Sequence, residues 1–358
     1  MIRKLQIMLA AALALCSVMI LIACGDSKVV LTTGFGSNEA FRVGSEKATT
    51  TELMLYLTNI ANQYERVYGD ALWEMSVDED TTLLDNCKEV ALAQLSQVKA
   101  MKLLAKEHEV ELTEEEKGKA LSAAAEYLDG LADTEKEVLG ISEGEVVEQI
   151  YCEKLLADKL YAYLIRDVNP EISDDEARII TVQHILLKTY TMDEHGNRQE
   201  LSKEQRRQIY EKAEEIRQLA VDGESFDSLI SKYSEDSKGT YSFGIGDLDE
   251  NFEKAAFALA TDEIGPVVET SHGYHIMKCI STLDREQTDL NKVKLLVSRK
   301  QEVFGNTYNQ FVGQLEKREN LEVITSMELP DRNVVDTAEL FSIYDSMLGG
   351  TFETAEYN

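Results

Sequence analysis

The chain has 358 residues but only three prolines, five cysteines and five histidines. Few prolines and no low-complexity tract exclude long extended linkers within the body of the protein. The histidines are scattered, and no HExxH or CxxC motif is present. A metalloenzyme is therefore disfavoured, because its site needs several converging ligands. We expect neither a metal nor a cofactor.

The few cysteines do not predict a disulfide framework. Cys16 and Cys24 lie in an apolar segment at the amino terminus, which leaves Cys87, Cys152 and Cys279 widely separated. An odd, scattered set of this kind favours buried free thiols. A Cys-His hydrolase built on Cys279 is disfavoured as well, since nothing near it in the sequence would activate the thiol.

Positive charge is scarce. The 36 lysines and arginines are outnumbered by 66 aspartates and glutamates, which gives a formal net charge of −30 at pH 7. An acidic surface of this kind repels phosphate backbones and anionic lipid headgroups. We therefore expect no nucleic-acid partner, whereas cationic or unfolded polypeptides are compatible with the charge.

A single long hydrophobic run occurs, at the amino terminus. Arg3 and Lys4 precede an apolar stretch from Ile7 to Ile22, which ends in the sequence LIACG. The run is short for a membrane-spanning helix, and small residues follow it. We interpret residues 1–23 as a signal peptide. An ordinary secretory signal and an uncleaved anchor are the alternatives.

The sequence LIACG resembles the signal of bacterial lipoproteins, in which the cysteine is acylated and becomes the new amino terminus. This resemblance implies lipidation at Cys24. Diacyl chains there would hold the protein on the extracytoplasmic face of the cell membrane, because stable anchoring needs more than one chain.

Helix-start signals recur, each a hydroxyl residue followed three positions later by Glu or Gln. The pairs are Thr49 with Glu52, Thr113 with Glu116, Ser142 with Glu145, Ser173 with Glu176, and Ser202 with Gln205. Amphipathic segments near 50–68, 80–108, 114–130 and 143–167 predict a helical region over residues 49–177. Within residues 24–48, the stretches 29–35 and 40–43 predict a short β-hairpin.

The pattern changes after Asn169 and Pro170. The run RIITVQHILLK, residues 178–188, is rich in β-branched residues and too short for a full helix, so it predicts a buried strand. We predict further strands near 240–243, 266–270 and 274–282, and helices over 203–222, 225–232 and 251–259. Residues 178–282 are thus expected to form a compact α+β unit.

Residues 285–319 predict one long amphipathic helix. Its apolar residues are Leu290, Val293, Val297, Phe304, Tyr308, Phe311 and Leu315. Such a helix is not stable alone in water, so we expect segment 283–326 to pack on the amino-terminal helices. The α+β unit would then be inserted into a helical domain built from both chain ends. The acidic tail, 327–358, lacks sustained periodicity and is expected to be mobile.

Two histidines, His272 and His275, lie three residues apart in VVETSHGYHIMK. On a strand they point to opposite faces, which argues against a metal chelate made by this pair alone. His184 is in register with Val182 and Leu186, so it also belongs to a buried strand face. His184 and His275 satisfy each other's ring nitrogens if their strands are neighbours. The spacing leaves open whether they are a packed core pair or part of an active site.

Four motifs carry a family resemblance: HILLK from residue 184, GESFDSLISKYSED at 223–236, FEKAAFAL at 252–259, and GPVVETSHGYHIMK at 265–278. In this order and at these distances they resemble the parvulin family of peptidyl-prolyl cis/trans isomerases. The resemblance covers residues 178–282. It implies a four-stranded antiparallel sheet with about four helices, and isomerisation of X-Pro bonds.

The resemblance also implies roles for individual residues. His184 and His275 correspond to the paired active-site histidines, and Asp236 takes the place of the residue that faces the substrate amide. Thr270 corresponds to the hydroxyl that completes the polar network. The loop after His184, TYTMDEHGNRQE, lacks the arginine cluster of phosphate-directed parvulins, so we expect no preference for phosphoserine-proline.

The apolar pocket for the proline ring is implied at Leu248 and Phe252. Parvulins carry a glycine-rich GGDLG stretch before this pocket, whereas here the chain reads SKGTYSFGIGDL and is several residues shorter between Asp236 and Phe252. One pocket wall is thus unassigned, and Tyr241 is a candidate for it.

The surrounding organisation resembles secreted foldase lipoproteins of Gram-positive bacteria, the PrsA type, and more distantly the periplasmic chaperone SurA. This implies an extracytoplasmic isomerase that assists the folding of secreted proteins, with unfolded or newly secreted polypeptides as partners. A homodimer formed through the helical region is left open. The alternative is a binding-only, membrane-tethered chaperone with an inactive parvulin-like domain.

Overall fold

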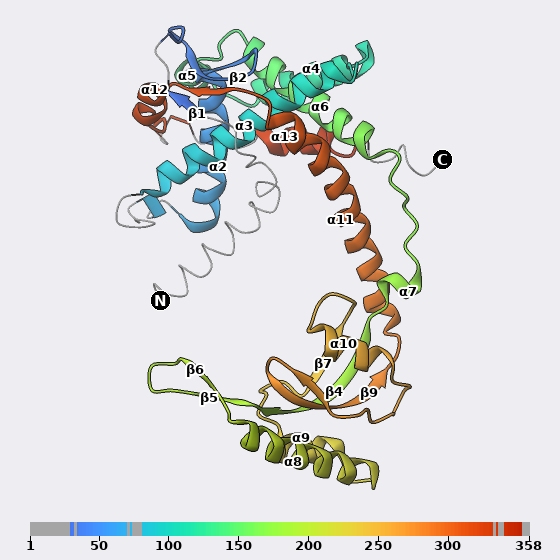
Figure 1. The fold of residues 1–358 in the computed structure, drawn as a ribbon. Helices are drawn as coiled ribbons and strands as arrows, with labels where there is room; N and C mark the ends of the chain where they lie inside the picture. Colours follow the sequence, from blue (N-terminus) through green and yellow to red (C-terminus); the bar gives the residue numbers. More distant parts are fainter. Residues whose placement is uncertain are drawn as a thin grey trace. The chain divides into compact units, whose positions relative to one another are not determined.

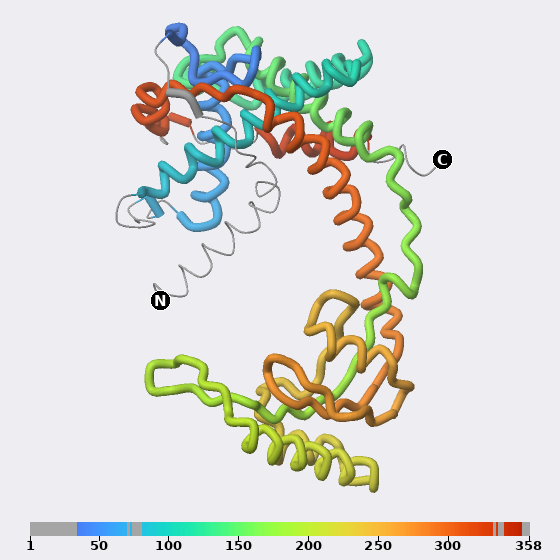
Figure 2. Tube along the Cα trace, viewed as in Figure 1, coloured from blue at the N-terminus to red at the C-terminus, as the bar shows by residue number. Residues whose placement is uncertain are grey.

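The computed structural model describes residues 29–31, 34–69, 72–73, 81–331, 334–335 and 340–352. The signal-peptide interpretation and Cys24 fall outside these residues. The chain divides into two units (Figures 1 and 2): residues 1–168 with 300–358, and residues 169–299. Among the described residues, no helix has both the length and the apolar character needed to cross a membrane.

The first unit is mainly helical and is built from both chain ends. Its elements are β1 (Val29–Leu31), β2 (Glu39–Val43), β3 (Glu46–Thr49), α2 (Thr50–Tyr68), α3 (Leu83–Glu107), α4 (Glu114–Asp129), α5 (Asp133–Leu139), α6 (Glu145–Ile165), the end of α11 (Arg285–Val312), β10 (Lys317–Glu319), α12 (Leu321–Ser326) and α13 (Leu340–Leu348). A four-stranded sheet with the order β1-β10-β2-β3 joins the two ends. Because β10 lies between two amino-terminal strands, this unit requires both segments.

Capping residues define several helix starts as predicted. Thr49, Thr113 and Ser202 each form a full capping box, and the Ser173 hydroxyl accepts a hydrogen bond from the Glu176 N–H. The cap predicted at Ser142 is wrong. Gly144, with φ +77°, precedes α6 instead, because a turn over residues 141–144 places the serine before the helix start.

The predicted pairing of 29–35 with 40–43 is also wrong. β2 pairs antiparallel with β3 across a tight turn at Gly44, whose φ is +55°, while β1 pairs parallel with the distant β10. A two-residue turn with positive φ favours the β2–β3 hairpin. The sequence pattern contained the strands but not this long-range pairing.

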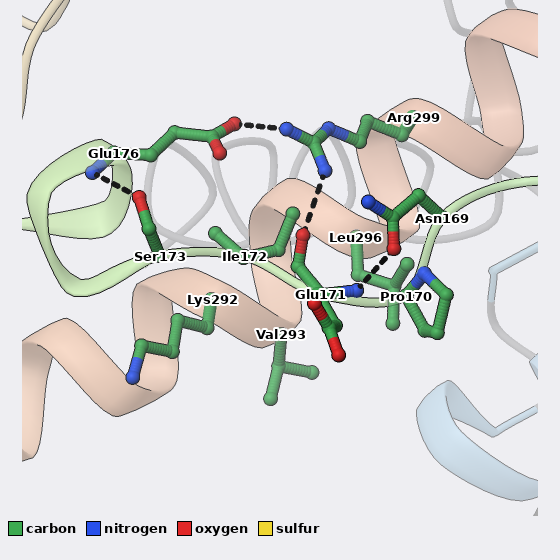
Figure 3. A pocket seen from close by; sticks show the side chains of 10 residues that line it. All are labelled: Asn169, Pro170, Glu171, Ile172, Ser173, Glu176, Lys292, Val293, Leu296 and Arg299. Atoms are coloured by element: carbon green, nitrogen blue, oxygen red, sulfur yellow. Dashed lines mark hydrogen bonds and ion pairs between the residues drawn. The ribbon is translucent and has the colours of Figure 1, made fainter.

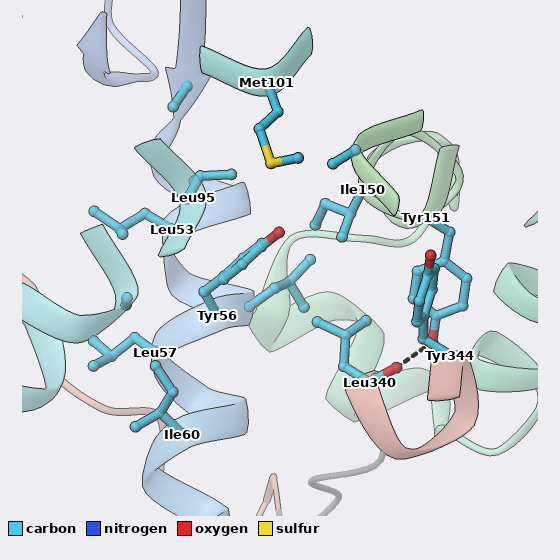
Figure 4. Close-up of a cluster of buried hydrophobic side chains, with 14 of the residues drawn as sticks. Leu53, Tyr56, Leu57, Ile60, Leu95, Met101, Ile150, Tyr151, Leu340 and Tyr344 are labelled. Carbon is cyan, nitrogen blue, oxygen red and sulfur yellow. Dashed lines mark hydrogen bonds between the residues drawn. The ribbon is translucent and has the colours of Figure 1, made fainter. Parts of the chain in front are cut away.

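The tail was expected to be mobile, but part of it belongs to the core of the first unit. Leu340, Tyr344 and Leu348 of α13 are at most 2% exposed. Figure 4 shows Leu340 and Tyr344 beside Tyr151, whose hydroxyl donates a 2.5 Å hydrogen bond to the Leu340 carbonyl. The apolar spacing i, i+4, i+8 is helical, but a segment of 9 residues is too short to show sustained periodicity.

The long helix α11 begins at Arg285 as predicted, but its end and the burial of its first half differ from the prediction. It ends at Val312, and residues 317–319 form β10. Leu290 and Val293 are 66% and 63% exposed, so this part of the predicted apolar stripe is not buried. The later residues Phe304 and Tyr308 are 6% and 3% exposed and join the core of the first unit.

The second unit contains a four-stranded antiparallel sheet with the order β7-β4-β9-β8. Its elements, besides the start of α11, are α7 (Asp174–Ala177), β4 (Ile180–Lys188), β5 (Tyr190–Met192), β6 (Arg198–Glu200), α8 (Lys203–Val221), α9 (Phe226–Tyr233), β7 (Thr240–Phe243), α10 (Glu250–Phe257), β8 (Val268–Thr270) and β9 (Gly273–Ser281). The fold-class prediction is confirmed: an α+β domain is inserted into a helical one.

The two faces of this sheet have different partners. Ile185 and Ile276 lie on the face that packs against α8 and α9. Val182 and Met277 lie on the opposite face, which packs against α10. Since strand residues alternate between faces, His184 shares the α10 face. The sheet therefore places this histidine between its own surface and a helix that carries apolar side chains.

Candidate active site

The paired histidines come from the two central strands of the sheet. In the β4–β9 register His184 lies opposite Met277, and His275 lies opposite Leu186. The two imidazoles therefore occupy diagonal positions on one face. They are 2% and 6% exposed, their rings stack at 18°, and their Nδ1 atoms are 3.2 Å apart. The strand adjacency expected from the sequence is present.

The direction of the hydrogen bonds follows from the outer partners. Nε2 of His184 lies 3.0 Å from the Lys238 carbonyl oxygen and 3.2 Å from Oδ2 of Asp236, so it must donate. In a neutral ring Nδ1 of His184 then accepts, and Nδ1 of His275 donates to it. The Thr270 hydroxyl, 2.9 Å away, donates to Nε2 of His275. Four polar groups thus form one directional chain.

Burial keeps both rings neutral. It lowers the pKa of His275 to about 4, with a further contribution from His184 nearby. It also lowers the pKa of His184, although the Lys238 carbonyl and the Asp236 carboxylate oppose the shift. At neutral pH the pair is therefore uncharged, and each ring keeps one fixed tautomer.

Asp236 provides a carboxylate at the edge of this chain. Burial alone would raise its pKa, but hydrogen bonds from the Lys238 N–H and the Tyr241 hydroxyl, together with His184, lower it below the usual range. The Tyr241 hydroxyl donates at 3.0 Å to Oδ2. With its side chain 22% exposed, this ionised group faces the cavity from a fixed position.

Apolar and aromatic side chains form the remaining walls. The Phe252 ring meets His184 and His275 edge-on, with centroids 5.6 and 5.0 Å apart. The Tyr241 ring lies 5.0 Å from that of His184, and Leu248 is 37% exposed. The cavity between them has a volume of about 460 Å³. It is large enough for a proline ring and parts of its neighbours.

All seven residues predicted for catalysis and substrate binding line this one cavity. The sequence analysis missed further lining residues: Leu186, Lys188, Tyr190, Glu235, Ser237, Asp249 and His272. Leu186 and Lys188 belong to the HILLK motif, and that motif was the available signal for them. Tyr190 comes from the β5–β6 hairpin, which was predicted as a loop.

A larger groove of about 710 Å³ lies between residues 169–176 and α11 (Figure 3). Both of its cationic side chains are already paired: Arg299 binds the Glu171 carbonyl and the Glu176 carboxylate, and Lys292 binds Asp174. These bonds fasten the segment that enters the domain to the helix that leaves it. Within the described part of the chain, no three His, Cys, Asp or Glu side chains converge as metal ligands.

Comparison with known proteins agrees with this geometry. Residues 184–281 match the family described as rotamase, PPIC-type PPIase domain. The foldase protein PrsA of Bacillus subtilis is 33% identical over 131 residues, which cover 35% of this chain and 43% of that protein. PrsA of Caldanaerobacter subterraneus is 29% identical, covering 75% of this chain and 83% of that protein, and PrsA of Clostridium acetobutylicum is 24% identical, covering 81% and 87%.

Among solved structures, PrsA from Bacillus cereus aligns with a TM-score of 0.36 and 19% identity, covering 76% of this chain and 98% of that one. A score this low supports no statement about the arrangement of the whole chain. The sequence matches identify residues 184–281 as a parvulin-type domain of the peptidyl-prolyl isomerase family. Over most of its length the chain is similar to PrsA foldases. The predicted family is thereby confirmed.

Proposed function

We propose that this protein accelerates cis/trans isomerisation of X-Pro bonds in unfolded or newly secreted polypeptides. The observation that carries the proposal is the neutral pair of His184 and His275, held by Thr270 and Asp236 beside the Phe252 wall. An apolar recess next to oriented polar groups fits a proline ring with its flanking amide. The matches to PrsA foldases support the same class of substrate.

The chemistry requires no bond to the substrate to form or break. Rotation about an X-Pro bond has a barrier of about 20 kcal/mol, because the twisted amide loses its resonance. A site lowers this barrier if it binds the twisted amide better than either planar form. The Phe252 and Leu248 walls grip the ring, while the histidine chain keeps the floor of the pocket fixed and uncharged.

Asp236 acts on the amide through its charge in this account. Its carboxylate disfavours negative charge on the nearby carbonyl oxygen, and that charge is a feature of the planar, resonance-stabilised amide. Weakening this resonance favours rotation. Because Tyr241 and the Lys238 N–H hold the carboxylate, its position is fixed before substrate binds. No nucleophilic role is assigned to it.

A refolding assay tests the proposal. The substrate is an unfolded protein whose slow phase is prolyl isomerisation, and the full chain is added in catalytic amount. We expect the slow rate to rise in proportion to the chain concentration, while the fast phase does not change. A slow rate independent of the added chain would refute an isomerase.

A binding-only chaperone is the second candidate. Two observations favour it. The segment between Asp236 and Phe252 is shorter than the corresponding stretch of parvulins, and Phe252 is only 4% exposed, which leaves little of its ring to contact a substrate. This reading predicts suppression of client aggregation at stoichiometric amounts without any change in the slow refolding rate. The same assay, followed by light scattering, separates the two functions.

We also propose that the protein is anchored by lipid at Cys24 on the extracytoplasmic side of the cell membrane. The support is the sequence LIACG after a short apolar run, together with the PrsA matches. Cys24→Ala should abolish labelling by a fatty-acid analogue and either block processing or release the protein from membranes. Unchanged processing together with unchanged membrane retention would refute the anchor.

A further inference from the structure

A buried carboxylate outside the predicted site lies directly behind the proline pocket. Glu253 follows Phe252 on α10 and is 8% exposed. It accepts hydrogen bonds from the Gly246 N–H at 2.9 and 3.0 Å, one to each oxygen, and from the Leu248 N–H at 2.7 Å. Among the described residues, no lysine, arginine or histidine forms an ion pair with it. Its charge is therefore compensated by backbone amides.

The loop that Glu253 binds, residues 244–248, is not anchored by its apolar side chains. Ile245 is 67% exposed and Leu248 is 37% exposed, so neither is anchored in a core. Gly246 has φ +94°, a conformation that other residues rarely adopt. Besides Glu253, the Asp247 carboxylate accepts from the Gly244 N–H within the loop itself. The Glu253 carboxylate thus hydrogen-bonds this loop to α10.

The position of this contact links the two apolar walls of the pocket. Leu248 is held through its own N–H, and Phe252 is the residue before Glu253 on the helix. One carboxylate therefore fixes the spacing between both walls. Burial of a charged group is unfavourable unless its hydrogen bonds are satisfied, so the loop and the carboxylate stabilise each other.

We propose that Glu253 is a positioning residue that sets the width of the proline pocket, and with it the size of the ring that the site accepts. This inference rests on the proposed isomerase function, because the ring that fills the pocket is the substrate's. Of the 244–248 loop, only Leu248 lines the cavity, so Glu253 acts on the pocket through this residue. Glu253 itself does not line the cavity.

The test compares two peptides that are identical except for the ring, one with proline and one with its six-membered homologue, pipecolic acid. Full-length Glu253→Ala loses the hydrogen bonds to Gly246 and Leu248. We expect KM for the proline peptide to rise roughly tenfold, as for the loss of a well-placed charge-assisted hydrogen bond, with kcat changed less. The pipecolyl-to-prolyl ratio of kcat/KM should rise several-fold, since a loosened wall admits the larger ring.

Two further variants serve as comparisons. Glu253→Gln keeps one carbonyl oxygen, which can still accept from both amides, so its effects should be intermediate. Glu250→Ala removes an exposed carboxylate from the first turn of the same helix and should match the unchanged protein. If Glu253→Ala does not fold, Glu253→Gln is compared with the unchanged protein instead. The measured quantity is again the ring ratio, which is the pipecolyl-to-prolyl ratio of kcat/KM.

Hydrogen exchange followed by mass spectrometry reads the contact without relying on activity. The amides of residues 244–248 should exchange faster in Glu253→Ala than in Glu250→Ala. Unchanged exchange, or faster exchange with an unchanged ring ratio, would overturn the proposal. If the unchanged chain does not isomerise either peptide, the proposed function fails by itself. The ring ratio is then read from the dissociation constants of the two peptides, and an unchanged ratio overturns the role of Glu253.

Discussion

His184 and His275 share a hydrogen bond between their Nδ1 atoms, 3.2 Å apart, across the two central strands of the sheet. Only one of the two nitrogens carries a proton, so the bond exists only while at least one ring is neutral. Asp236 and the Lys238 carbonyl set the orientation at one end, and Thr270 sets it at the other. Each member of the chain therefore has a testable consequence.

Replacing His275 by Ala should lower kcat/KM for a proline peptide on the order of tenfold, because the Thr270 hydroxyl and the His184 ring lose a buried partner. The helical content should be unchanged, since His275 and its partner His184 lie in strands. His195, exposed in the β5–β6 hairpin, supplies the control as His195→Ala, which should match the unchanged protein. The domain could instead unfold in His275→Ala while the fraction that stays folded keeps full activity. That result would show that the histidine pair stabilises the core and has no role in catalysis.

The pH dependence of stability follows from the lowered pKa of His275. The unfolded ring has a pKa near 6.5 and the folded one about 4, so the unfolded state binds more protons between these values. Stability from this group is present above pH 6.5 and is lost as the pH falls toward 4. The loss should reach about 3 kcal/mol.

Urea unfolding at pH 7 and pH 4.5 measures this effect as a difference between the unchanged protein and His275→Asn. The variant should lose less stability on acidification, because its side chain does not titrate. The isomerase activity of the unchanged protein should likewise persist well below pH 6.5. An unburied histidine pair would be protonated near pH 6.5, and activity would fall there. Equal acid losses in both proteins would contradict the burial of a neutral ring.

Asp236 and Tyr241 should behave as a coupled pair. Asp236→Asn removes the charge, and Tyr241→Phe removes the 3.0 Å hydrogen bond that orients it. Each variant should reduce kcat/KM, and the double variant should lose less than the sum, with a coupling of about 1 kcal/mol. Fully additive losses would mean that the tyrosine does not act through the carboxylate.

A buried ion network in the helical unit gives a stability prediction. Nζ of Lys99, fully buried, lies 2.5 Å from Oε1 of Glu52 and 2.7 Å from Oε2 of Glu153. Lys99→Met should destabilise the unit by about 3 to 5 kcal/mol, because the buried Glu52 carboxylate loses its cation and Glu153 keeps only Lys102. The neighbouring Lys102 is 35% exposed, so Lys102→Met should lower the free energy of unfolding by about 1 kcal/mol or less. Equal effects in urea unfolding would show that burial does not matter here.

Local signals predicted much of the structure. The capping box at Thr49 and the amphipathic spacing predicted a helix over 50–68, and α2 spans Thr50–Tyr68. Each of the four parvulin motifs likewise contains predicted residues that line the cavity: His184 in the first, Asp236 in the second, Phe252 in the third, and Thr270 and His275 in the fourth. Their placement in one cavity could be anticipated, whereas their roles in catalysis stay predictions.

Long-range pairing was beyond the sequence. The parallel register of Val29 with Lys317 joins residues from opposite ends of the chain, and no local pattern encodes it. Helix α13 is too short to predict, and it is stabilised by contacts such as the edge-on packing of Phe341 on Tyr56. The exposure of Leu290 on α11 was missed for the same reason: an apolar stripe indicates what is available for burial, not which part finds a partner.

The most direct test of the isomerase is cis/trans exchange of a short X-Pro peptide, observed by exchange NMR with a catalytic amount of the full chain. The account predicts exchange far faster than the uncatalysed process of tens of seconds, and slowed again by His275→Ala. Binding of the peptide to the cavity without any gain in the exchange rate would contradict it.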